Sequence, residues 1–186
     1  MYKRVENELD LAIFNGIWTT VWREKGYELE FCDNVLEQNI ISTKKGEFVG
    51  TAELKPYIAD INQSINEIAP FHKHPWIIEC NGRVAEIDKI AILKTFRGKG
   101  EHIALVLSSI VHSSAQFQLK YLVSLMEPIF LRALRITFKV PLQQVGEKTF
   151  YKGDHVIPVI LDVGYVIEHA EEFSWYVHPA VMQPSY

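Results

Sequence analysis

The sequence predicts an α/β (α+β) domain with a mixed β-sheet and helices on both of its faces. The main observation is a succession of strand, glycine-rich turn, helix and strand over residues 84–126. One hairpin signal precedes this unit and another follows it. Together these signals indicate a parallel pair of strands with antiparallel strands on either side.

The amino-terminal third predicts a helix, a hairpin and a second, short helix. Apolar side chains recur at helical spacing over residues 5–25, and Gly26 is expected to end that helix. Segments 39–42 and 48–54 are strand-like and flank a turn. Isoleucines spaced three, four and three residues apart then predict a short helix within residues 56–70.

The middle of the chain predicts a right-handed βαβ unit. Residues 84–93 alternate as in a strand, and residues 119–126 form a compact apolar strand expected to run parallel to it. Apolar residues from Ile103 to Val111 make one continuous helical face, which begins after the turn at 97–100.

The carboxyl-terminal part predicts a helix, a hairpin and a surface segment. The helix covers roughly residues 127–134, with Pro128 in its first turn. Residues 150–152 and 156–162 flank a Gly-Asp turn and form the hairpin. The aromatic-rich remainder, 164–186, is expected to pack on the surface.

The composition indicates one domain over residues 1–186, with its core at about 5–162 and a C-terminal segment at 163–186. Hydrophobic residues make up 48% of the chain, and the net charge of −4 argues against a nucleic-acid partner. Cys32 and Cys80 are isolated, which fits a reducing compartment. No apolar run reaches the roughly 18–20 residues of a membrane span, and the amino terminus is charged rather than signal-like, so we expect a cytoplasmic protein.

The turn Arg97-Gly98-Lys99-Gly100 is suited to binding a pyrophosphate. Glycines remove the Cβ atoms that would hold a phosphate away, and the first turn of a helix offers unpaired N–H groups. Arg97 and Lys99 add positive charge. The alternative is a solvated turn that merely relieves backbone strain. The position between a strand and a helix favours the phosphate site.

Residues 91–100, Ala-Ile-Leu-Lys-Thr-Phe-Arg-Gly-Lys-Gly, resemble the central motif of the GNAT acyltransferases, Arg/Gln-x-x-Gly-x-Gly/Ala. In that family the loop binds the coenzyme A pyrophosphate. Arg97 and Gly100 match the motif, whereas its last position is His102, which would narrow or retune the phosphate cradle. The resemblance implies that the acyl carrier contacts Ile90, Ile92, Arg97, Gly98, Lys99, Gly100, Glu101 and His102.

Residues 86–92, Glu-Ile-Asp-Lys-Ile-Ala-Ile, are similar to the Glu-Leu-Ser-Arg-Phe-Ala-Val strand of the acyl-homoserine-lactone synthases and the related N-acyl amino acid synthases. Segments 21–27, 28–33 and 49–56 resemble further parts of those enzymes, so the likeness covers about residues 1–162. It implies a GNAT-like fold with six or seven strands and an acyl donor on coenzyme A or on an acyl-carrier protein. It also implies substrate contacts at Arg23, Asp33 and Glu53.

Three positions depart from these enzymes. Glu53 and Lys89 stand where the synthases usually carry arginine, and Leu131 stands where many GNAT enzymes have a general-acid tyrosine. Arginine grips a carboxylate through two parallel hydrogen bonds. The two replacements therefore weaken the expectation of a carboxylate-bearing acceptor.

Glu86 is the candidate general base, because it lies on the strand that leads into the carrier turn and partial burial would raise its pKa. Asp88 faces the same side and is the alternate base. The competing interpretation is a strand carboxylate held in a salt bridge. Backbone N–H groups near Ile90 and Ile92 would stabilise the oxyanion if the strand splays from its neighbour.

Two further groups have ordinary explanations. His72 and His74 have no third ligand nearby, so a surface pair is favoured over a metal site and we expect no metal. Trp175 and Tyr176 are aromatic residues that would either line an acyl pocket or pack in the core or a dimer interface, and the second is the commoner use.

The predicted function is transfer of an acyl group from acyl-CoA, acetyl-CoA or the phosphopantetheine of an acyl-carrier protein to the amine of a small, amino-acid-like metabolite. The alternative within this class is an acetyl-CoA-dependent N-acetyltransferase. The alternative from another class is a non-catalytic coenzyme A-binding module. The acyl length, the acceptor and the oligomeric state, including a homodimer, stay open.

Overall fold

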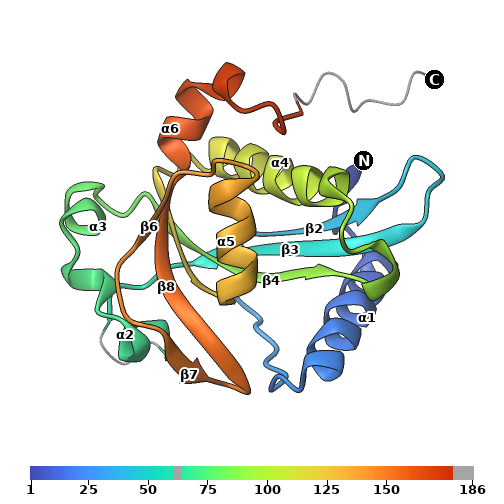
Figure 1. The fold of residues 1–186 in the computed structure, drawn as a ribbon, viewed down its shortest axis with the longest axis horizontal. Coiled ribbons are helices and arrows are strands. Elements are labelled where there is room, and N and C mark those ends of the chain that lie inside the picture. Colours follow the sequence, from blue (N-terminus) through green and yellow to red (C-terminus); the bar gives the residue numbers. More distant parts are fainter. Residues whose placement is uncertain (61–63, 178–186) are drawn as a thin grey trace.

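The computed structural model, which describes residues 1–60 and 64–177, has an eight-stranded mixed sheet in the order β1-β2-β3-β4-β5-β8-β6, with β7 paired to β8 outside this path (Figure 1). β4 and β5 are parallel, and the other neighbours are antiparallel. The strands are β1 (Tyr2–Arg4), β2 (Glu37–Ser42), β3 (Phe48–Pro56), β4 (Val84–Ile92), β5 (Tyr121–Met126), β6 (Leu142–Gln144), β7 (Thr149–Tyr151) and β8 (Asp154–Asp162).

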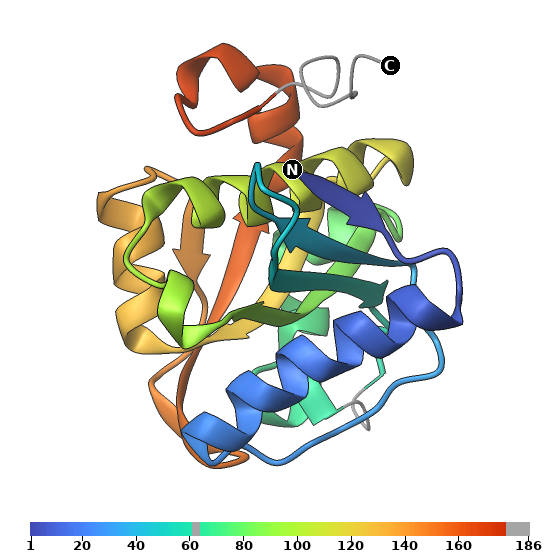
Figure 2. The ribbon, with the colours of Figure 1, turned by 90° about the vertical axis from the view of Figure 1, so that its right-hand side faces the viewer.

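Helices cover both faces of the sheet, as the sequence predicts, with α1 and α4 on opposite sides (Figure 2). The helices are α1 (Glu8–Lys25), α2 (Ser64–Ile68), α3 (Pro75–Glu79), α4 (Gly100–Gln116), α5 (Pro128–Ile136) and α6 (Val163–Glu168), and short 3₁₀ turns occupy Phe71–Lys73, Lys94–Phe96 and Ala170–Glu172. Within the described ranges, no helix is long and apolar enough to cross a membrane.

The ends of α1 follow from local chemistry. The Asn7 side chain accepts a hydrogen bond from the Asp10 amide, which satisfies one of the free N–H groups of the first turn. At the other end Gly26 takes a left-handed conformation with φ of 78°, which glycine adopts without steric cost. The predicted end of this helix is confirmed.

The core has a layer on each side of the sheet. On one side α4, α5 and α6 pack on the strands through residues such as Val106, Leu134 and Val166. On the other side Phe14 and Trp18 of α1 form a separate cluster, and a third cluster lies beneath α2 and α3. The βαβ unit is therefore covered on both faces, as a parallel pair of strands requires.

The structure contains short elements that the sequence does not predict, the helices α3 and α6 among them. β1 and β6 are strands of three residues each, too short to leave a periodic pattern. They bring the path of the sheet to seven strands, within the expected six or seven, and β7 pairs with β8 as an eighth. Residues 164–186 are predicted to pack on the surface, but Phe173 and Trp175 are buried in the main core, which for Trp175 is one of the commoner uses named above. The Trp175 indole donates to the Phe138 carbonyl at 2.7 Å. Residues 178–186 of that prediction lie outside the described part.

Candidate active site

The site begins where β4 and β5 part. These strands are paired from Val84 and Tyr121 to Glu86 and Val123, and beyond that point the register between them ends although both strands continue. The Ser124 hydroxyl donates to the Ile87 carbonyl at 3.2 Å, so a side chain bridges the strands just past the last backbone pair. The strands thus part here, which is the condition given above for an oxyanion site near Ile90 and Ile92.

A cavity of about 410 Å³ occupies this opening. Its walls come from the end of α1 and the loop after it, from β4 and β5, from the glycine turn, from α5 and from the β7–β8 hairpin. The apolar lining residues are Val21, Trp22, Ile65, Ile87, Ile90, Ile92, Ile103, Leu125, Met126, Ile129, Phe130, Ala133 and Val156. Such a volume suits a small ligand or part of an extended one.

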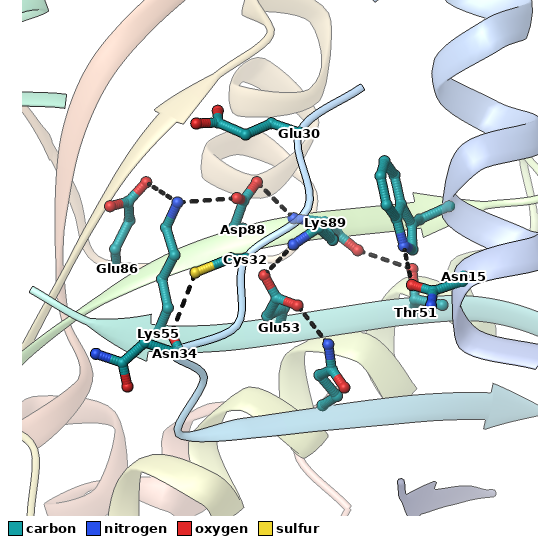
Figure 3. Close-up of polar contacts among 12 residues, drawn as sticks. Asn15, Glu30, Cys32, Asn34, Thr51, Glu53, Lys55, Glu86, Asp88 and Lys89 are labelled. Atoms are coloured by element: carbon teal, nitrogen blue, oxygen red, sulfur yellow. Dashed lines mark hydrogen bonds and ion pairs between the residues drawn. The ribbon is translucent and has the colours of Figure 1, made fainter. Parts of the chain in front are cut away.

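Both candidate bases lie in this cavity around one lysine (Figure 3). The Lys55 ammonium is 3.1 Å from Glu86 Oε1 and 3.0 Å from Asp88 Oδ2. Glu86 keeps 16% of its side chain exposed and Asp88 keeps 32%. Glu86 is thus both a cavity carboxylate and a member of a salt bridge, so it has features of both interpretations of the sequence.

The two carboxyl groups differ in acidity. Burial raises the pKa of Glu86 to about 7, because Lys55 compensates only part of the desolvation and Asp88 adds repulsion. Burial acts on Asp88 in the same direction, but the charges of Lys55 and Lys89 outweigh it and lower the Asp88 pKa. At neutral pH Glu86 can therefore exchange a proton, whereas Asp88 stays ionised.

Glu53 and Lys89, the two departures from the synthase pattern, form an ion pair with each other. The Glu53 side chain has no exposed surface, and it also accepts from Gln38 Nε2 at 2.7 Å. Lys89 lines the cavity and Glu53 does not. The predicted substrate contact at Glu53 is thus replaced in this structure by a contact within the protein.

Lys89 also marks a β-bulge in β4. The β3–β4 register shifts between Thr51 and Glu53, and Lys89 has a φ of 46°, which is uncommon for a residue with a side chain. The Thr51 hydroxyl donates to the Lys89 carbonyl at 2.7 Å, and Asp88 Oδ1 accepts from the Lys89 amide at 2.8 Å. The bulge is therefore fixed by side chains of both strands.

The glycine turn forms one end of the cavity, where Arg97, Gly98 and Lys99 line the wall. Gly98 has a φ of 80°, so a Cβ atom there would be strained even though the space around it is open. Arg97 makes a bidentate pair with Glu24 at 2.9 and 3.0 Å, and its Nε donates to the Ile92 carbonyl. The turn is thereby attached both to α1 and to the end of β4.

The next three predicted carrier residues lie outside the cavity lining. Gly100 begins α4, Glu101 is exposed, and His102 is 2% exposed with Nδ1 3.0 Å from the Phe96 carbonyl. The His102 ring is therefore turned toward the 3₁₀ turn before the glycines and is not part of the cavity lining. Ile90 and Ile92 do line the cavity, as expected of the carrier strand.

Two predicted substrate residues are not brought to the cavity. Arg23 and Asp33 are exposed and are not among its lining residues. Their neighbours on the same segments, Lys25, Glu28 and Glu30, line it instead. Helical spacing explains the difference for Arg23, because residues two positions apart on a helix point in different directions.

A second polar group, which sequence reasoning missed, lines the cavity. The Tyr27 hydroxyl donates to Asp154 Oδ2 at 3.1 Å and lies 3.5 Å from Glu127, which is paired with Lys25. Burial and the two carboxylates raise the pKa of Tyr27, so the phenol stays protonated. These residues come from segments up to 127 positions apart, and no sequence pattern links them.

Among the remaining candidates, His74, Trp175 and Tyr176 have structural roles, and His72 is half-buried in the 3₁₀ turn Phe71–Lys73. His74 Nδ1 accepts from the Trp76 amide at 3.3 Å and caps α3. Among residues 1–60 and 64–177, no group of three or more His, Cys, Asp or Glu side chains could hold a metal ion. Trp175 and Tyr176 pack in or against the main core and do not line the cavity.

The raised pKa of Glu86 makes a prediction about stability. Folding raises this pKa from 4.5 to about 7, so the ionised form is disfavoured in the native state and stability is lost as pH rises through this interval. Glu86→Gln removes the titration. We therefore expect the difference in melting temperature, variant minus wild type, to be larger at pH 8 than at pH 5.

Asp88→Asn is the matched control, because the Asp88 pKa is lowered and its charge stabilises the fold. This variant should melt below wild type at both pH values. If Glu86→Gln loses more stability at pH 8 than at pH 5, Glu86 is a stabilising salt-bridge residue and the opposite interpretation holds.

No protein-family model and no curated protein sequence matches the chain. Solved structures do match it. LasI, an AHL (acyl-homoserine-lactone) synthase, has a TM-score of 0.66 at 13% identity over 91% of this chain and 93% of its own. FeeM, an N-acyl amino acid synthase from uncultured soil microbes, has 0.65 at 13% identity over 88% and 91%. MesI, a CoA-dependent acyl-homoserine lactone synthase, has 0.61 at 12% identity over 89% and 87%.

These likenesses, together with the mixed sheet and the parting of β4 from β5, establish the fold predicted from residues 86–100. The chain has the GNAT-like fold that the acyl-homoserine-lactone synthases and the N-acyl amino acid synthase share.

Proposed function

We propose that this chain transfers an acyl group from a phosphopantetheine thioester, on coenzyme A or on an acyl-carrier protein, to the amine of a small metabolite. The observation that carries the proposal is the opening between β4 and β5, which joins a glycine turn at a helix start to a carboxyl group with a pKa near neutrality. The GNAT-like fold and the residues that line the cavity both support this proposal.

The donor would lie along this opening. Its pyrophosphate would meet Gly98, Lys99 and the first amides of α4, where the helix dipole favours negative charge. The pantetheine arm would follow Ile90 and Ile92 between the parted strands. The acyl chain would then reach the apolar wall made by β5 and α5, which includes Leu125, Met126, Phe130 and Ala133.

The chemistry needs a proton acceptor next to the thioester. The acceptor nitrogen forms a bond to the carbonyl carbon, the carbon–sulfur bond breaks, and its electron pair leaves on sulfur. Glu86 takes the proton that the nitrogen loses, and the β4 backbone near Ile90 and Ile92 supplies N–H donors to the oxyanion. The pKa of Glu86 near 7 suits a base that works at neutral pH.

A panel of donors tests this function. With acetyl- to dodecanoyl-CoA, and the same chains on acyl-carrier protein, we expect release of free thiol in the presence of an amine, and faster release for chains longer than acetyl because the inner wall is apolar. Turnover of acetyl-CoA alone would favour the N-acetyltransferase alternative. Binding of coenzyme A without turnover of any donor would favour the non-catalytic module.

Two glycine variants test the donor site, with Gly100→Ala as the control for Gly98→Val. Gly98→Val should weaken donor binding in a folded protein, because φ of 80° is strained for any residue with a Cβ atom. Gly100→Ala should weaken it less, since a Cβ atom there meets only the Phe138 ring at an ordinary 3.7 Å. Calorimetry with coenzyme A measures both, and equal affinities in the two variants would contradict the assignment of the turn.

Glu86→Gln tests the base. The amide keeps the shape and loses the basicity, so kcat should fall by about 10²–10⁴-fold while donor affinity stays close to that of wild type. Asp88→Asn should lower kcat less, because the lowered pKa of Asp88 makes it a weak base and its carboxylate is paired with Lys55. Full activity in Glu86→Gln together with loss of activity in Asp88→Asn would move the role to Asp88.

The cavity favours an acceptor without a carboxylate. Lys25, Lys55, Lys89 and Lys152 line it away from the glycine turn, and each is already paired with a carboxylate of the protein. A substrate carboxylate would compete with those pairs, and it would also face the carboxylates Glu28, Glu30, Glu86, Asp88, Glu127 and Asp154.

Matched acceptors that differ only in the carboxyl group test this preference. Cadaverine should give a higher kcat/KM than lysine, and tyramine a higher value than tyrosine, with the same acyl donor. Thiol release measured at equal concentrations of each pair gives the ratio. A preference for either free amino acid would show that one of the lysines leaves its internal partner to bind the substrate.

A further inference from the structure

Lys55 occupies the point at which the two candidate bases meet. It is paired in register with Glu86 across β3 and β4, it lines the cavity, and 18% of its side chain is exposed. Its ammonium lies between Glu86 Oε1 and Asp88 Oδ2, at 3.1 and 3.0 Å (Figure 3). The contact is fixed by the strand pairing, because the side chains of paired residues on neighbouring strands lie next to each other.

The two carboxylates that share this lysine are not equivalent. Asp88 uses both of its oxygens, one toward Lys55 and the other toward the Lys89 amide at 2.8 Å. Glu86 meets Lys55 through Oε1. The backbone bond orients Asp88 and favours its ionised form, whereas Glu86 depends on the lysine.

The charges that face Glu86 come from several elements. Asp88 on the same strand and Glu30 on the loop after α1 repel its ionised form, and Tyr57, which follows β3, lies close enough for Glu86 to raise the Tyr57 pKa. Glu30 is itself paired with Lys152. Lys55 is the cation that opposes burial and both carboxylates, and the pKa of Glu86 settles at about 7 between these effects.

We propose that Lys55 is a positioning residue, which holds Asp88 as a fixed carboxylate and leaves Glu86 as the group that takes the proton. The proposal rests on the acyltransferase function above and states which carboxyl group of that site takes the proton and which stays ionised. Lys55 contacts Glu86 and Asp88, and no bond to Lys55 forms or breaks in the proposed reaction. Its effect on the reaction therefore passes through the protonation of Glu86.

The pH profile tests this role. In Lys55→Met, Glu86 loses its compensating charge, so the acid limb of kcat/KM should move upward by about one pH unit or more, with activity recovering toward pH 9. Lys55→Arg keeps a cation between the carboxylates and should bring the limb back toward 7. Asp88→Asn removes a repelling charge and should move the limb downward.

A direct titration separates this proposal from the proposed function. In protein with carbon-13-labelled glutamate side chains, the Glu86 signal is the one missing from Glu86→Gln, and its midpoint should move as the kinetic limb moves. Lys25→Met is the matched control, since Lys25 lines the same cavity but is paired with Glu127. It should leave the midpoint in place.

An unchanged Glu86 midpoint in folded Lys55→Met overturns the proposal. If that variant does not fold, an unchanged midpoint in Asp88→Asn does the same. A uniform fall in activity at all pH values, without a shift in the limb, would mean that Lys55 only stabilises the strands. If the midpoints move as expected but no donor turns over, the acyltransferase function fails while the electrostatic link from Lys55 to Glu86 remains.

Discussion

Pairing between β4 and β5 ends at Glu86 and Val123, and the candidate site depends on that end. If the register continued, backbone atoms of β5 would fill the space now lined by Ile90, Ile92 and Met126. The glycine turn would then start a helix with no channel leading away from it. Because the strands part directly after Glu86, the same carboxyl group lies at the last point of pairing and at the start of the cavity.

Beyond Glu86, β4 is no longer paired with β5, so its position depends on its pairing with β3 at the other edge. β4 remains attached to β3, and it does so with a bulge at Lys89 and a buried ion pair between Lys89 and Glu53. A buried ion pair is weak evidence for stability, because desolvation offsets much of the attraction. The Glu53–Lys89 pair is better explained as fixing the register between β3 and β4. A one-residue slip would send Lys89 to the wrong face and leave Glu53 buried without a cation. The two departures from the synthase pattern thus compensate each other.

Periodic segments were predictable from the sequence, and contacts between distant segments were not. α1, α4 and β4 carry clear hydrophobic periods, and the motifs in residues 86–100 located Glu86 and Gly98, which both line the cavity. Lys55 was missed because its place beside Glu86 depends on the β3–β4 register across 31 residues. Tyr27 and Asp154 meet only after the β7–β8 hairpin returns to the end of α1, where Gly153 leaves no room for a Cβ atom.

The missing tyrosine at position 131 is consistent with a site in which Glu86, whose pKa burial raises to about 7, is the proposed proton carrier. Leu131 is a core residue, 3% exposed, and does not line the cavity, so a hydroxyl there would not reach a departing sulfur. A thiol has a pKa near 8.5, and Glu86 has one of about 7. In the proposed reaction, a proton that Glu86 takes from the amine would therefore pass downhill to the departing thiolate. A carboxyl group with the ordinary pKa would hold the proton too weakly to take it from nitrogen. The burial that raises the Glu86 pKa would thus let a single residue serve both steps of the proposed reaction.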